Sequence, residues 1–243
     1  MPHPCGYLPG RVTSCLLADP DHPMDESLYE VLLAKGFRRS GSQIYRPRCA
    51  GCGACFPVRL PVERFCWERS WRRVWKRNLD LHHSVQPPAY QEGHYRLYKA
   101  YLQSRHGDGP MAEGISPESY LEFLAHPFEG AEFHEFWLEG RVVMVAVVDR
   151  LPSSLSAVYT FFDPSPALAR RSLGSLAVLW QIVEAQRLGL PWVYLGYWIE
   201  GCRKMSYKSR FAPLETLTAA GWRPLMTASS SPPEEEAWFS EGE

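Results

Sequence analysis

Apolar residues recur with helical spacing in four parts of the chain. In residues 24–35, four apolar positions fall on one helical face before Gly36: Leu28, Val31, Leu32 and Leu33. This spacing predicts a helix that ends at the glycine. The same reasoning predicts helices at residues 95–105, 117–125 and 172–188. Ser116 and Pro117 suit the cap and first position of one of them, and Gly189 suits the end of another.

Runs of β-branched and aromatic residues predict the strands. They lie at residues 12–17, 37–45, 56–65, 132–138, 141–148, 156–162 and 192–199. Glu139-Gly140 joins two of these runs in a pattern typical of a β-hairpin. A hairpin followed by a strand, a helix and a strand is an α+β order. It is also the order of the acyltransferase superfamily that includes the acetyl-CoA-dependent (GNAT) N-acetyltransferases, so we expect a GNAT-like domain.

Pro87-Pro88 is the predicted boundary between two modules. Residues 1–86 are expected to form a smaller N-terminal α/β module with a cysteine loop. Residues 87–226 are expected to form the GNAT-like catalytic domain on which it packs. Residues 227–243 are rich in Ser, Pro and Glu and cannot bury enough apolar surface to fold, so we expect a disordered acidic tail.

The composition favours a globular protein of the cytoplasm. The 243 residues are 45% hydrophobic, enough for one sizeable core or two modest ones. The sequence shows no N-terminal secretion signal and no apolar run of ~18 residues, so secretion and membrane insertion are not expected. The seven cysteines are an odd number in a chain too large to need disulfides, which favours a reducing compartment.

A net charge of −1 conceals a strongly basic segment. Residues 64–77 carry six bases and one acid, a balance of +5, whereas residues 228–243 carry a balance of −5. A helix is predicted from Ser70, as its N-cap, to about Asn78, so the bases cover a helix surface. Such a surface suits the phosphates of a polyanion.

Trp71 and Trp75 lie four residues apart in this basic helix. Indoles can stack on unpaired bases, so the mixture suits a tRNA acceptor end, although packing in the core explains the two indoles better. Arg171 begins a loop, Arg171-Ser-Leu-Gly174-Ser-Leu176, at the place where acetyl-CoA enzymes bind pyrophosphate. Leu176 replaces the final small residue of that loop, which counts against acetyl-CoA. The predicted tRNA contacts are Arg69, Arg72, Arg73, Lys76, Arg77 and Arg171.

Cys49, Cys52 and Cys55 are spaced three residues apart in a glycine-containing loop. This spacing allows one chain to wrap zinc or an iron–sulfur cluster, with Cys5 as the fourth ligand. The alternative is three unliganded thiols in a loop whose glycines serve only its turns. Three other cysteines adjoin apolar or aromatic residues and are predicted to be buried and free: Cys15, Cys66 and Cys202.

The segment from Tyr194 to Glu215 is a predicted strand followed by a stretch rich in Lys, Tyr and Arg. These side chains suit an acidic peptide terminus or a tRNA 3′ end, or else form an ordinary amphipathic surface. The pool of substrate-binding candidates is Arg46, Arg59, Lys204, Tyr207, Lys208 and Arg210.

Taken together, these segments resemble the arginyl/leucyl-tRNA–protein transferase family, in particular its bacterial leucyl-transferring branch. The resemblance runs from residue 5 to about residue 215. It is carried by Cys5-Gly-Tyr-Leu-Pro-Gly-Arg11, Gly36-Phe-Arg-Arg-Ser40, Tyr45-Arg-Pro, residues 49–59, residues 70–78, Tyr159 to Pro164, Arg171-Ser-Leu-Gly174 and Tyr194 to Glu215.

The resemblance implies transfer of leucine from leucyl-tRNA to N-terminal Asp or Glu, which creates a degradation signal (N-degron) for a downstream adaptor and protease. Arginyl transfer is the alternative within the family, and an acetyl-CoA-dependent N-acetyltransferase is the alternative outside it. The chemistry requires no cofactor, because the aminoacyl ester is already activated and positioning of the amine supplies much of the acceleration. A zinc ion or iron–sulfur cluster would be structural or regulatory.

A carboxylate or phenol would assist by accepting the proton of the amine, and hydrogen-bond donors would stabilise the oxyanion. Strand ends in this type of domain tend to face the cleft. The catalytic candidates are therefore Tyr159, Asp163 and Tyr197.

Overall fold

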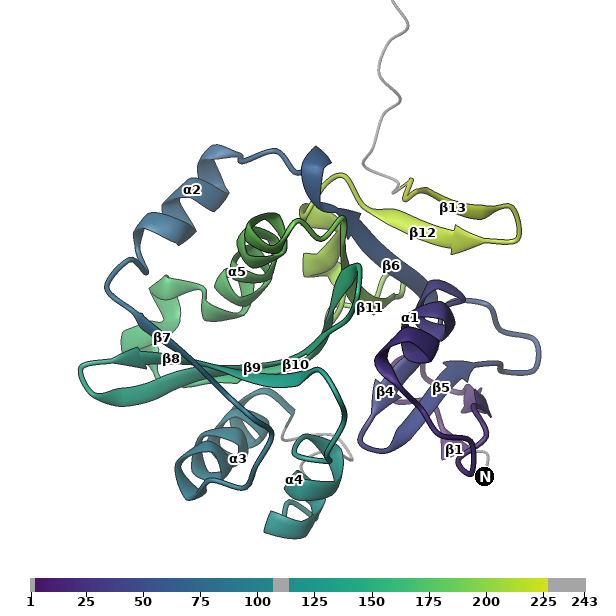
Figure 1. Cartoon of the computed structure of the whole chain (residues 1–243), viewed down its shortest axis with the longest axis horizontal. Coiled ribbons are helices and arrows are strands. Elements are labelled where there is room, and N and C mark those ends of the chain that lie inside the picture. Colours follow the sequence, from purple (N-terminus) through teal and green to yellow (C-terminus); the bar gives the residue numbers. More distant parts are fainter. Residues whose placement is uncertain (1–2, 107–113, 227–243) are drawn as a thin grey trace, which may run out of the picture.

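Eight strands form one central sheet in the computed structural model, which describes residues 3–106 and 114–226 (Figure 1). Across the sheet they are β13 (Gly221–Pro224), β12 (Glu215–Thr218), β6 (Phe56–Pro61), β11 (Trp192–Trp198), β10 (Ser154–Phe162), β9 (Arg141–Arg150), β8 (Ala131–Leu138) and β7 (His82–Gln86). Of these strands, β10 and β11 pair in parallel, and all other neighbours pair antiparallel.

Helices cover both faces of this sheet (Figure 1). Helices α3 (Glu92–His106) and α4 (Pro117–Phe123) lie on one face, and α5 (Leu173–Leu188) lies on the other. Helix α2 (Arg69–Lys76) packs on α5. The predicted α+β class is confirmed by this arrangement. None of the described helices is long and apolar enough to cross a bilayer.

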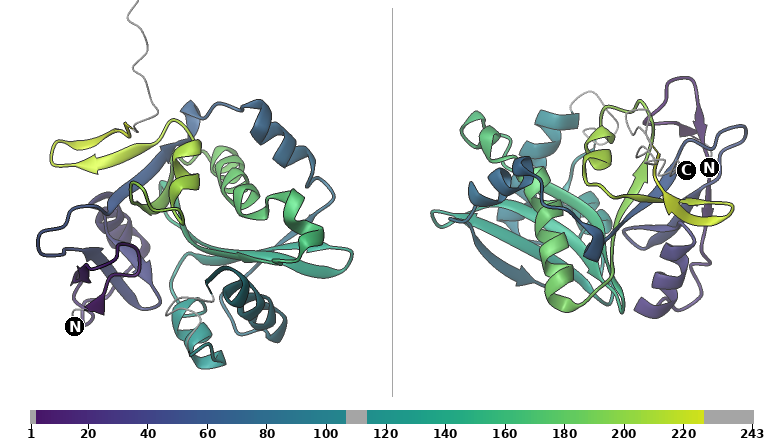
Figure 2. Two further views of the ribbon diagram at one scale, coloured as in Figure 1. Left: turned by 180° about the vertical axis from the view of Figure 1, so that it is seen from behind. Right: turned by 90° about the horizontal axis from the view of Figure 1, so that it is seen from above.

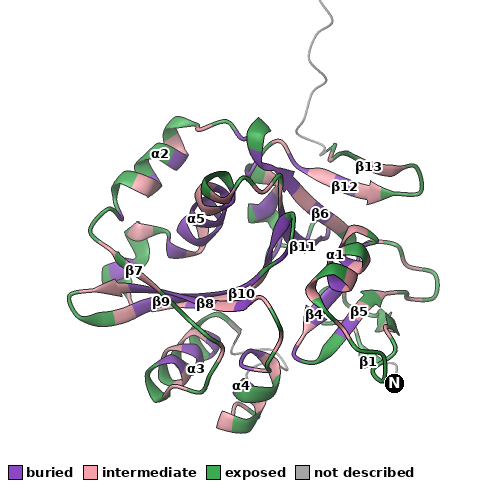
Figure 3. Ribbon diagram, in the orientation of Figure 1, coloured by how far each residue is buried: buried purple, intermediate pink, exposed green. Residues whose placement is uncertain are grey.

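Strand β9 is buried on both faces because helices cover the sheet on both sides (Figure 3). Val145 and Val147 pack in the core under α3 and α4, whereas Met144 and Ala146 pack in the core under α5. The alternation of strand side chains therefore divides one nearly continuous apolar run between two cores.

A smaller sheet and helix α1 lie beside the β6 end of the large sheet (Figure 2). The small sheet has the order β3 (Cys15–Leu17), β5 (Gln43–Pro47), β4 (Arg38–Ser40), and α1 spans Glu26–Ala34. A two-stranded ribbon, β1 (His3–Pro4) with β2 (Val12–Thr13), precedes it. Arg39 of β4 forms a buried ion pair with Asp149 of β9 at 2.5 Å, which fastens the two sheets together.

Most predicted elements are confirmed, with small shifts at their ends. Helices α1, α3, α4 and α5 and the β8–β9 hairpin occur where the pattern places them. Ser116 caps α4 by accepting a hydrogen bond from the Ser119 N–H at 3.1 Å, and Gly189 ends α5 with a φ of 69°. The predicted face of α1 is partly wrong, because Val31 is 52% exposed while Tyr29 and Leu33 are buried.

Other predictions are wrong for local reasons. The single strand predicted at residues 37–45 is the β4–β5 hairpin, which turns at Gly41 with a φ of 59°. Ser70 lies inside α2, whose N-cap is Glu68, because the helix begins one residue earlier at Arg69. The strands β7, β12 and β13 were not predicted; β7 begins with two histidines, an unusual composition for a strand.

The large sheet crosses the predicted boundary at residues 86 and 87. Strands β6 and β7 both come from residues 1–86, yet they pair with β11 and β8 of the C-terminal part. The predicted tail at residues 227–243 lies outside the described residues.

Candidate functional site

Strands β10 and β11 begin as a parallel pair and then stop pairing. Their register runs only from Ser154 opposite Trp192 to Ser156 opposite Tyr194. Each strand has a register shift directly after this point, at Ala157/Tyr159 in β10 and at Tyr194/Gly196 in β11. Beyond these register shifts, residues 157–162 continue beside β9 and residues 195–198 continue beside β6. We call the region between these two stretches the β10–β11 opening.

Arg38 of β4 lies at the start of the β10–β11 opening. It is only 7% exposed, and its guanidinium donates to the carbonyl oxygen of Ala157 and, at 3.5 Å, to the hydroxyl of Ser156. A β-carbon added at Gly196 of β11 would approach the Arg38 Cζ to 3.2 Å. Gly196 also has a φ of 79°, a conformation that glycine adopts without strain. Glycine at this position therefore leaves room for the guanidinium.

Lys208 lies on the β11 side of the opening, in the 3₁₀ turn η3 (Ser206–Arg210). It is 8% exposed, and its Nζ donates to the carbonyl oxygen of Tyr197 at 2.6 Å. The pKa of Lys208 is lowered to about 7, mainly by burial and secondly by the positive charge of Arg38. The Cys202 thiol acts weakly in the opposite direction, and the Tyr207 ring lies 6.0 Å from Nζ.

Arg38 and Lys208 share an unusual property. Within the described residues, neither cation forms an ion pair, although both are buried and close enough to repel each other. A buried charge without a partner is costly, so such groups persist where a ligand supplies the missing charge. The pair is therefore a candidate anion-binding centre at the point where the two strands diverge.

Three tyrosines lie near the opening: Tyr207 is close to Lys208 and Arg38, Tyr159 belongs to β10, and Tyr7 interacts with Tyr159. Tyr159 of β10 has a hydroxyl with no hydrogen-bond partner among the described residues, and burial, followed by the neighbouring Tyr101 phenol, raises its pKa. Tyr207 is 42% exposed and Tyr7 is 51% exposed, yet burial of their hydroxyls raises both pKa values to about 12.

The other two catalytic candidates are held by the protein itself. The Tyr197 hydroxyl donates to the carbonyl oxygen of Gly36 at 2.7 Å, and burial raises its pKa. Asp163 accepts hydrogen bonds from Arg141 at 2.6 Å and from the Ser165 N–H at 2.8 Å. Burial works to raise the Asp163 pKa, but these hydrogen bonds outweigh it and lower the pKa.

The remaining substrate-binding candidates do not gather at the opening with Lys208 and Tyr207. Arg59 is ion-paired with Glu215 at 2.9 Å, with its guanidinium 3.5 Å from the centre of the Trp192 ring. Arg46 donates to the carbonyl oxygen of Lys35 at 2.8 Å. Arg210 lies over the Trp71 ring at 4.9 Å, and Lys204 is exposed. Arg59 is thus a structural cation, and the other three lie on the surface.

The predicted basic helix forms an exposed cationic surface. All five predicted bases of residues 69–77 are exposed, whereas Trp71 is buried and stacks on Phe211 at 4.4 Å. Trp75 is only partly buried. Arg77 donates to the carbonyl oxygen of Arg170, and Arg171 forms a two-pronged ion pair with Asp80 at 2.7 and 2.8 Å. The end of α2 is thereby fastened to the 3₁₀ turn η2 (Pro166–Arg171), which follows β10.

The cysteine loop packs against the N-terminal ribbon. The backbones of Cys49 and Cys52 pair as an isolated antiparallel β-bridge. Burial raises the Cys55 pKa to about 11, and the neighbouring Cys49 and Cys5 add to that rise. Within the described residues, no three His, Cys, Asp or Glu side chains converge closely enough to hold a metal. The predicted burial of Cys15 and Cys66 is wrong, because Cys15 is exposed in β3 and Cys66 is exposed between η1 (Val62–Arg64) and α2, whereas the predicted burial of Cys202 is confirmed.

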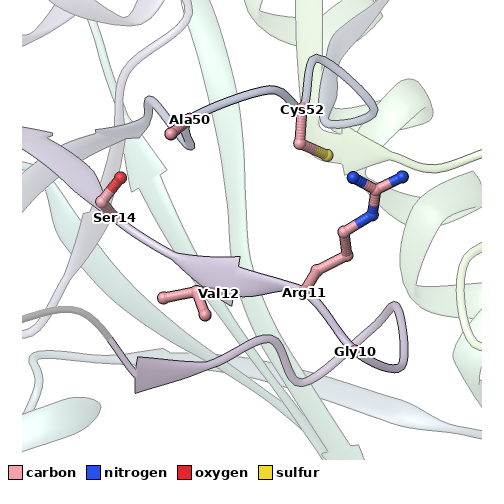
Figure 4. Close-up of a pocket in the computed structure, with 6 residues that line it drawn as sticks. All are labelled: Gly10, Arg11, Val12, Ser14, Ala50 and Cys52. Carbon is pink, nitrogen blue, oxygen red and sulfur yellow. The ribbon is translucent and has the colours of Figure 1, made fainter.

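A pocket of about 320 Å³ lies between this loop and the ribbon (Figure 4). Its lining comprises Gly10, Arg11, Val12, Ser14, Ala50 and Cys52. Figure 4 shows the Arg11 guanidinium extending towards the side of the pocket that bears Cys52. Of the four candidate metal ligands, Cys52 alone lines this pocket.

Arg38 was not among the site residues predicted from the sequence. Its signal was the pair Arg38-Arg39 inside a predicted strand, where two adjacent side chains must point to opposite faces and at least one charge must be buried. In the structure both are buried: Arg39 has the carboxylate partner Asp149, and Arg38 has none among residues 3–106 and 114–226.

Comparisons with known proteins cover nearly the whole chain. Residues 3–73 match the family described as arginine-tRNA-protein transferase, N terminus, and residues 93–218 match arginine-tRNA-protein transferase, C terminus. A Pseudomonas fluorescens protein named aspartate/glutamate leucyltransferase is 48% identical over 221 residues, covering 91% of this chain and 93% of that protein. One of the same name from Chromohalobacter salexigens is 50% identical over 225 residues, covering 92% and 90%.

A solved structure also overlaps the chain. It is that of L-PGS from Bacillus licheniformis, which is 12% identical and covers 70% of this chain and 48% of that chain with a TM-score of 0.41.

Proposed function

The chain belongs to the arginine-tRNA-protein transferase family, and we propose that it transfers leucine from leucyl-tRNA to proteins that begin with Asp or Glu. It is a tRNA-dependent aminoacyltransferase. The choice of leucine over arginine follows the names of relatives 48% and 50% identical to it. Leucylation would create an N-degron for an adaptor and protease in the cytoplasm.

The observation that carries this proposal is the pair of buried side chains Arg38 and Lys208, which have no carboxylate partner in the part of the chain that the structure describes. An acceptor that begins with Asp or Glu brings a side-chain carboxylate, which would contact both side chains and offset one positive charge. Asn or Gln would leave both cations uncompensated, at a cost of several kcal/mol. The pair thus supplies selectivity for acidic N-termini.

The reaction at the opening would be a simple aminolysis. The acceptor α-amine, with an ordinary pKa of ~7.7–8, is substantially neutral near pH 7.5 and attacks the ester carbon. A C–N bond forms, the C–O bond to the ribose breaks, and the amine proton replaces the ester at the ribose oxygen. Lys208, whose pKa is about 7, is partly protonated in this pH range. Only the protonated lysine would form an ion pair with the carboxylate of the acceptor.

Among the catalytic candidates, the contacts favour Tyr159. A raised pKa keeps its hydroxyl protonated, and the hydroxyl has no partner within the described residues, so it is free to donate to the developing oxyanion. The Tyr197 hydroxyl is already hydrogen-bonded to Gly36, and the Asp163 carboxylate is already hydrogen-bonded to Arg141. We assign them to holding the two strand ends in place.

The large sheet is proposed to be GNAT-like, because its parallel pair stops pairing part-way along. Acetyl-CoA as donor is disfavoured at the start of α5. A β-carbon at Gly174 would lie 3.2 Å from the Phe162 ring, so packing against this ring already accounts for the glycine without a pyrophosphate. Arg171 is engaged with Asp80.

We also propose that Cys5, Cys49, Cys52 and Cys55 hold a zinc ion or iron–sulfur cluster. Thiolates are the ligands that these groups prefer, and the four lie in one region of the N-terminal part. The metal would stabilise the loop around Arg11 and Tyr7. No step of the transfer depends on it.

The test is a donor and acceptor matrix with purified protein. Leucyl-tRNA, arginyl-tRNA and acetyl-CoA are each offered with peptides that begin with Asp, Glu, Asn or Ala. We expect leucine on the Asp and Glu peptides only. Arginine on those peptides would move the chain to the arginyl branch, and acetyl transfer without tRNA would refute the proposed function.

A further inference from the structure

Helices α2 and α5 enclose a second pocket, away from the β10–β11 opening. Its volume is about 410 Å³, within the ~300–1,000 Å³ typical of ligand sites. The lining residues are Trp67, Arg72, Trp75, Lys76 and Val183. Two indoles and two cations on an apolar base form a combination that none of the assigned steps uses.

The two indoles present aromatic surface to the pocket. Trp67 and Trp75 meet edge to face at 5.6 Å, and both are only partly buried. Trp71, on the same helix, is instead 2% exposed and packs in the core. The core therefore accounts for Trp71, whereas Trp67 and Trp75 pack only partly against it and line the pocket, where they can contact a planar ligand.

The charge around the pocket complements a polyanion. Arg72 and Lys76 line it, and Arg69 and Arg73 extend the cationic surface along α2. Among the described residues, none of these four forms an ion pair. The nearby carboxylate of Glu184 is already paired with Arg187 at 2.6 Å.

The pocket can be placed along α5 relative to the turn that follows β10. Val183 lies ten residues beyond Leu173, the first residue of α5, which is about 15 Å at 1.5 Å per residue. The first turn of α5 follows η2, to which the end of α2 is fastened through Arg77. In a stacked strand with ~3.4 Å per nucleotide, this distance corresponds to about four nucleotides.

We propose that the α2–α5 pocket receives an unpaired base of the tRNA acceptor arm, a few nucleotides before the aminoacyl ester. The base stacks on Trp75 and Trp67, and Arg72 and Lys76 bind the adjoining phosphates. This assignment rests on the proposed tRNA-dependent function and adds a specific contact to it. It makes the pocket a determinant of how single-stranded RNA enters the enzyme.

The experiment measures binding of two RNA hairpins by fluorescence anisotropy over a salt series. One hairpin ends in a single-stranded 3′ extension and the other is blunt. Wild-type protein should bind the extended hairpin about tenfold more tightly, the value of one stacked base. Trp75→Ala should remove this preference without changing the salt dependence, and Trp75→Phe should retain most of it.

A second variant protects the test against misfolding of Trp75→Ala. Val183→Phe fills the pocket from α5 and leaves both indoles in place, and it should also remove the preference. Arg96→Ala, an exposed change on α3, is the matched control and should behave as wild type. Undiminished preference in folded Trp75→Ala and Val183→Phe would overturn the assignment.

The two proposals fail in distinguishable ways. If leucine transfer proceeds and the pocket variants keep the preference for the extended hairpin, only the pocket assignment fails. If the preference is lost in the pocket variants but no amino acid is transferred from any tRNA, the proposed function fails and the RNA site stands. A protein ligand in the pocket would show as equal binding of the two hairpins by wild type.

Discussion

Folding changes the charge of Lys208. It is buried next to Arg38 and donates to a carbonyl oxygen, so its ammonium form loses hydration and gains a like-charged neighbour. Gly196 permits this arrangement because its missing side chain leaves room for the Arg38 guanidinium. The arrangement of Arg38 and Lys208 therefore depends on contacts between individual side-chain and backbone atoms.

The Lys208 pKa predicts a pH-dependent stability. The folded-state value, about 7, lies below the 10.5 of an ordinary lysine, so the unfolded chain binds more protons between these values. Stability should therefore rise with pH from about 7 to about 10.5, by up to ~1.4 kcal/mol per unit, and the cost is fully present below pH 7.

Urea unfolding of wild type and Lys208→Met between pH 6.5 and 9.5 measures this term. The difference between the two free energies of unfolding should change with pH in the predicted direction. Lys204→Met, which removes an exposed lysine of the same segment, is the control and should leave the pH dependence of wild type intact. Parallel curves for wild type and Lys208→Met would contradict the assigned pKa.

Gly196→Ala should lower activity more than stability. The backbone at this residue has a φ of 79°, so alanine costs about 1–2 kcal/mol, and its methyl group displaces the Arg38 guanidinium. Gly201→Ala is the matched control, since its φ is 74° and no atom lies within 4 Å of the added carbon. We expect similar unfolding midpoints and a loss of kcat/KM for Gly196→Ala alone. Equal activity in both variants would remove Gly196 from the site.

Among the elements, periodicity predicted the helices and the parallel unit well. Helix α5 and strands β10 and β11 occur as expected because long apolar segments have one way to be buried. The β4–β5 hairpin was missed, since Gly41 interrupts a run that otherwise looks continuous. Tyr197 and Lys208 were named from the sequence, but their contact with each other and with Arg38 depends on pairing of distant segments, which no local pattern encodes.

Helix α2 is predicted to bind tRNA through its exposed cations. Replacing Arg73 with Ala should weaken binding of tRNA and reduce the slope of log affinity against log salt by about 0.7–0.9, the effect of one phosphate contact. Arg96→Ala on α3 serves as control. Filter binding between 50 and 250 mM salt measures both slopes, and an unchanged slope for Arg73→Ala would exclude this residue from the tRNA surface.

At the scale of the whole molecule, the large sheet joins the two parts of the chain that the sequence separates at residues 86 and 87. Strand β6 of the N-terminal part pairs with β11, and Arg38 of the small sheet reaches the β10–β11 opening. Composition shifts at Pro87-Pro88 marked a linker, but antiparallel pairing across it is a long-range property. The N-terminal part therefore contributes half of the anion-binding centre.

The cysteine region is predicted to bind metal in the whole protein. Anaerobically purified wild type should contain zinc or iron at about one site per chain, and Cys52→Ser should lose most of it. Cys66→Ser changes an exposed cysteine of the same part and is the control. Elemental analysis decides the question, and equal metal in wild type and Cys52→Ser would leave the thiols unliganded.

The most direct test of the account is leucine transfer from leucyl-tRNA to two peptides that differ only in an N-terminal Asp or Asn, by wild type and Lys208→Met. We predict a kcat/KM for the Asp peptide about 100-fold above that for the Asn peptide, since a carboxylate facing two buried cations contributes several kcal/mol. Lys208→Met should remove most of this preference while leaving the Asn peptide unaffected. An Asp preference that survives in Lys208→Met, or no leucine on either peptide with wild type, would contradict the account.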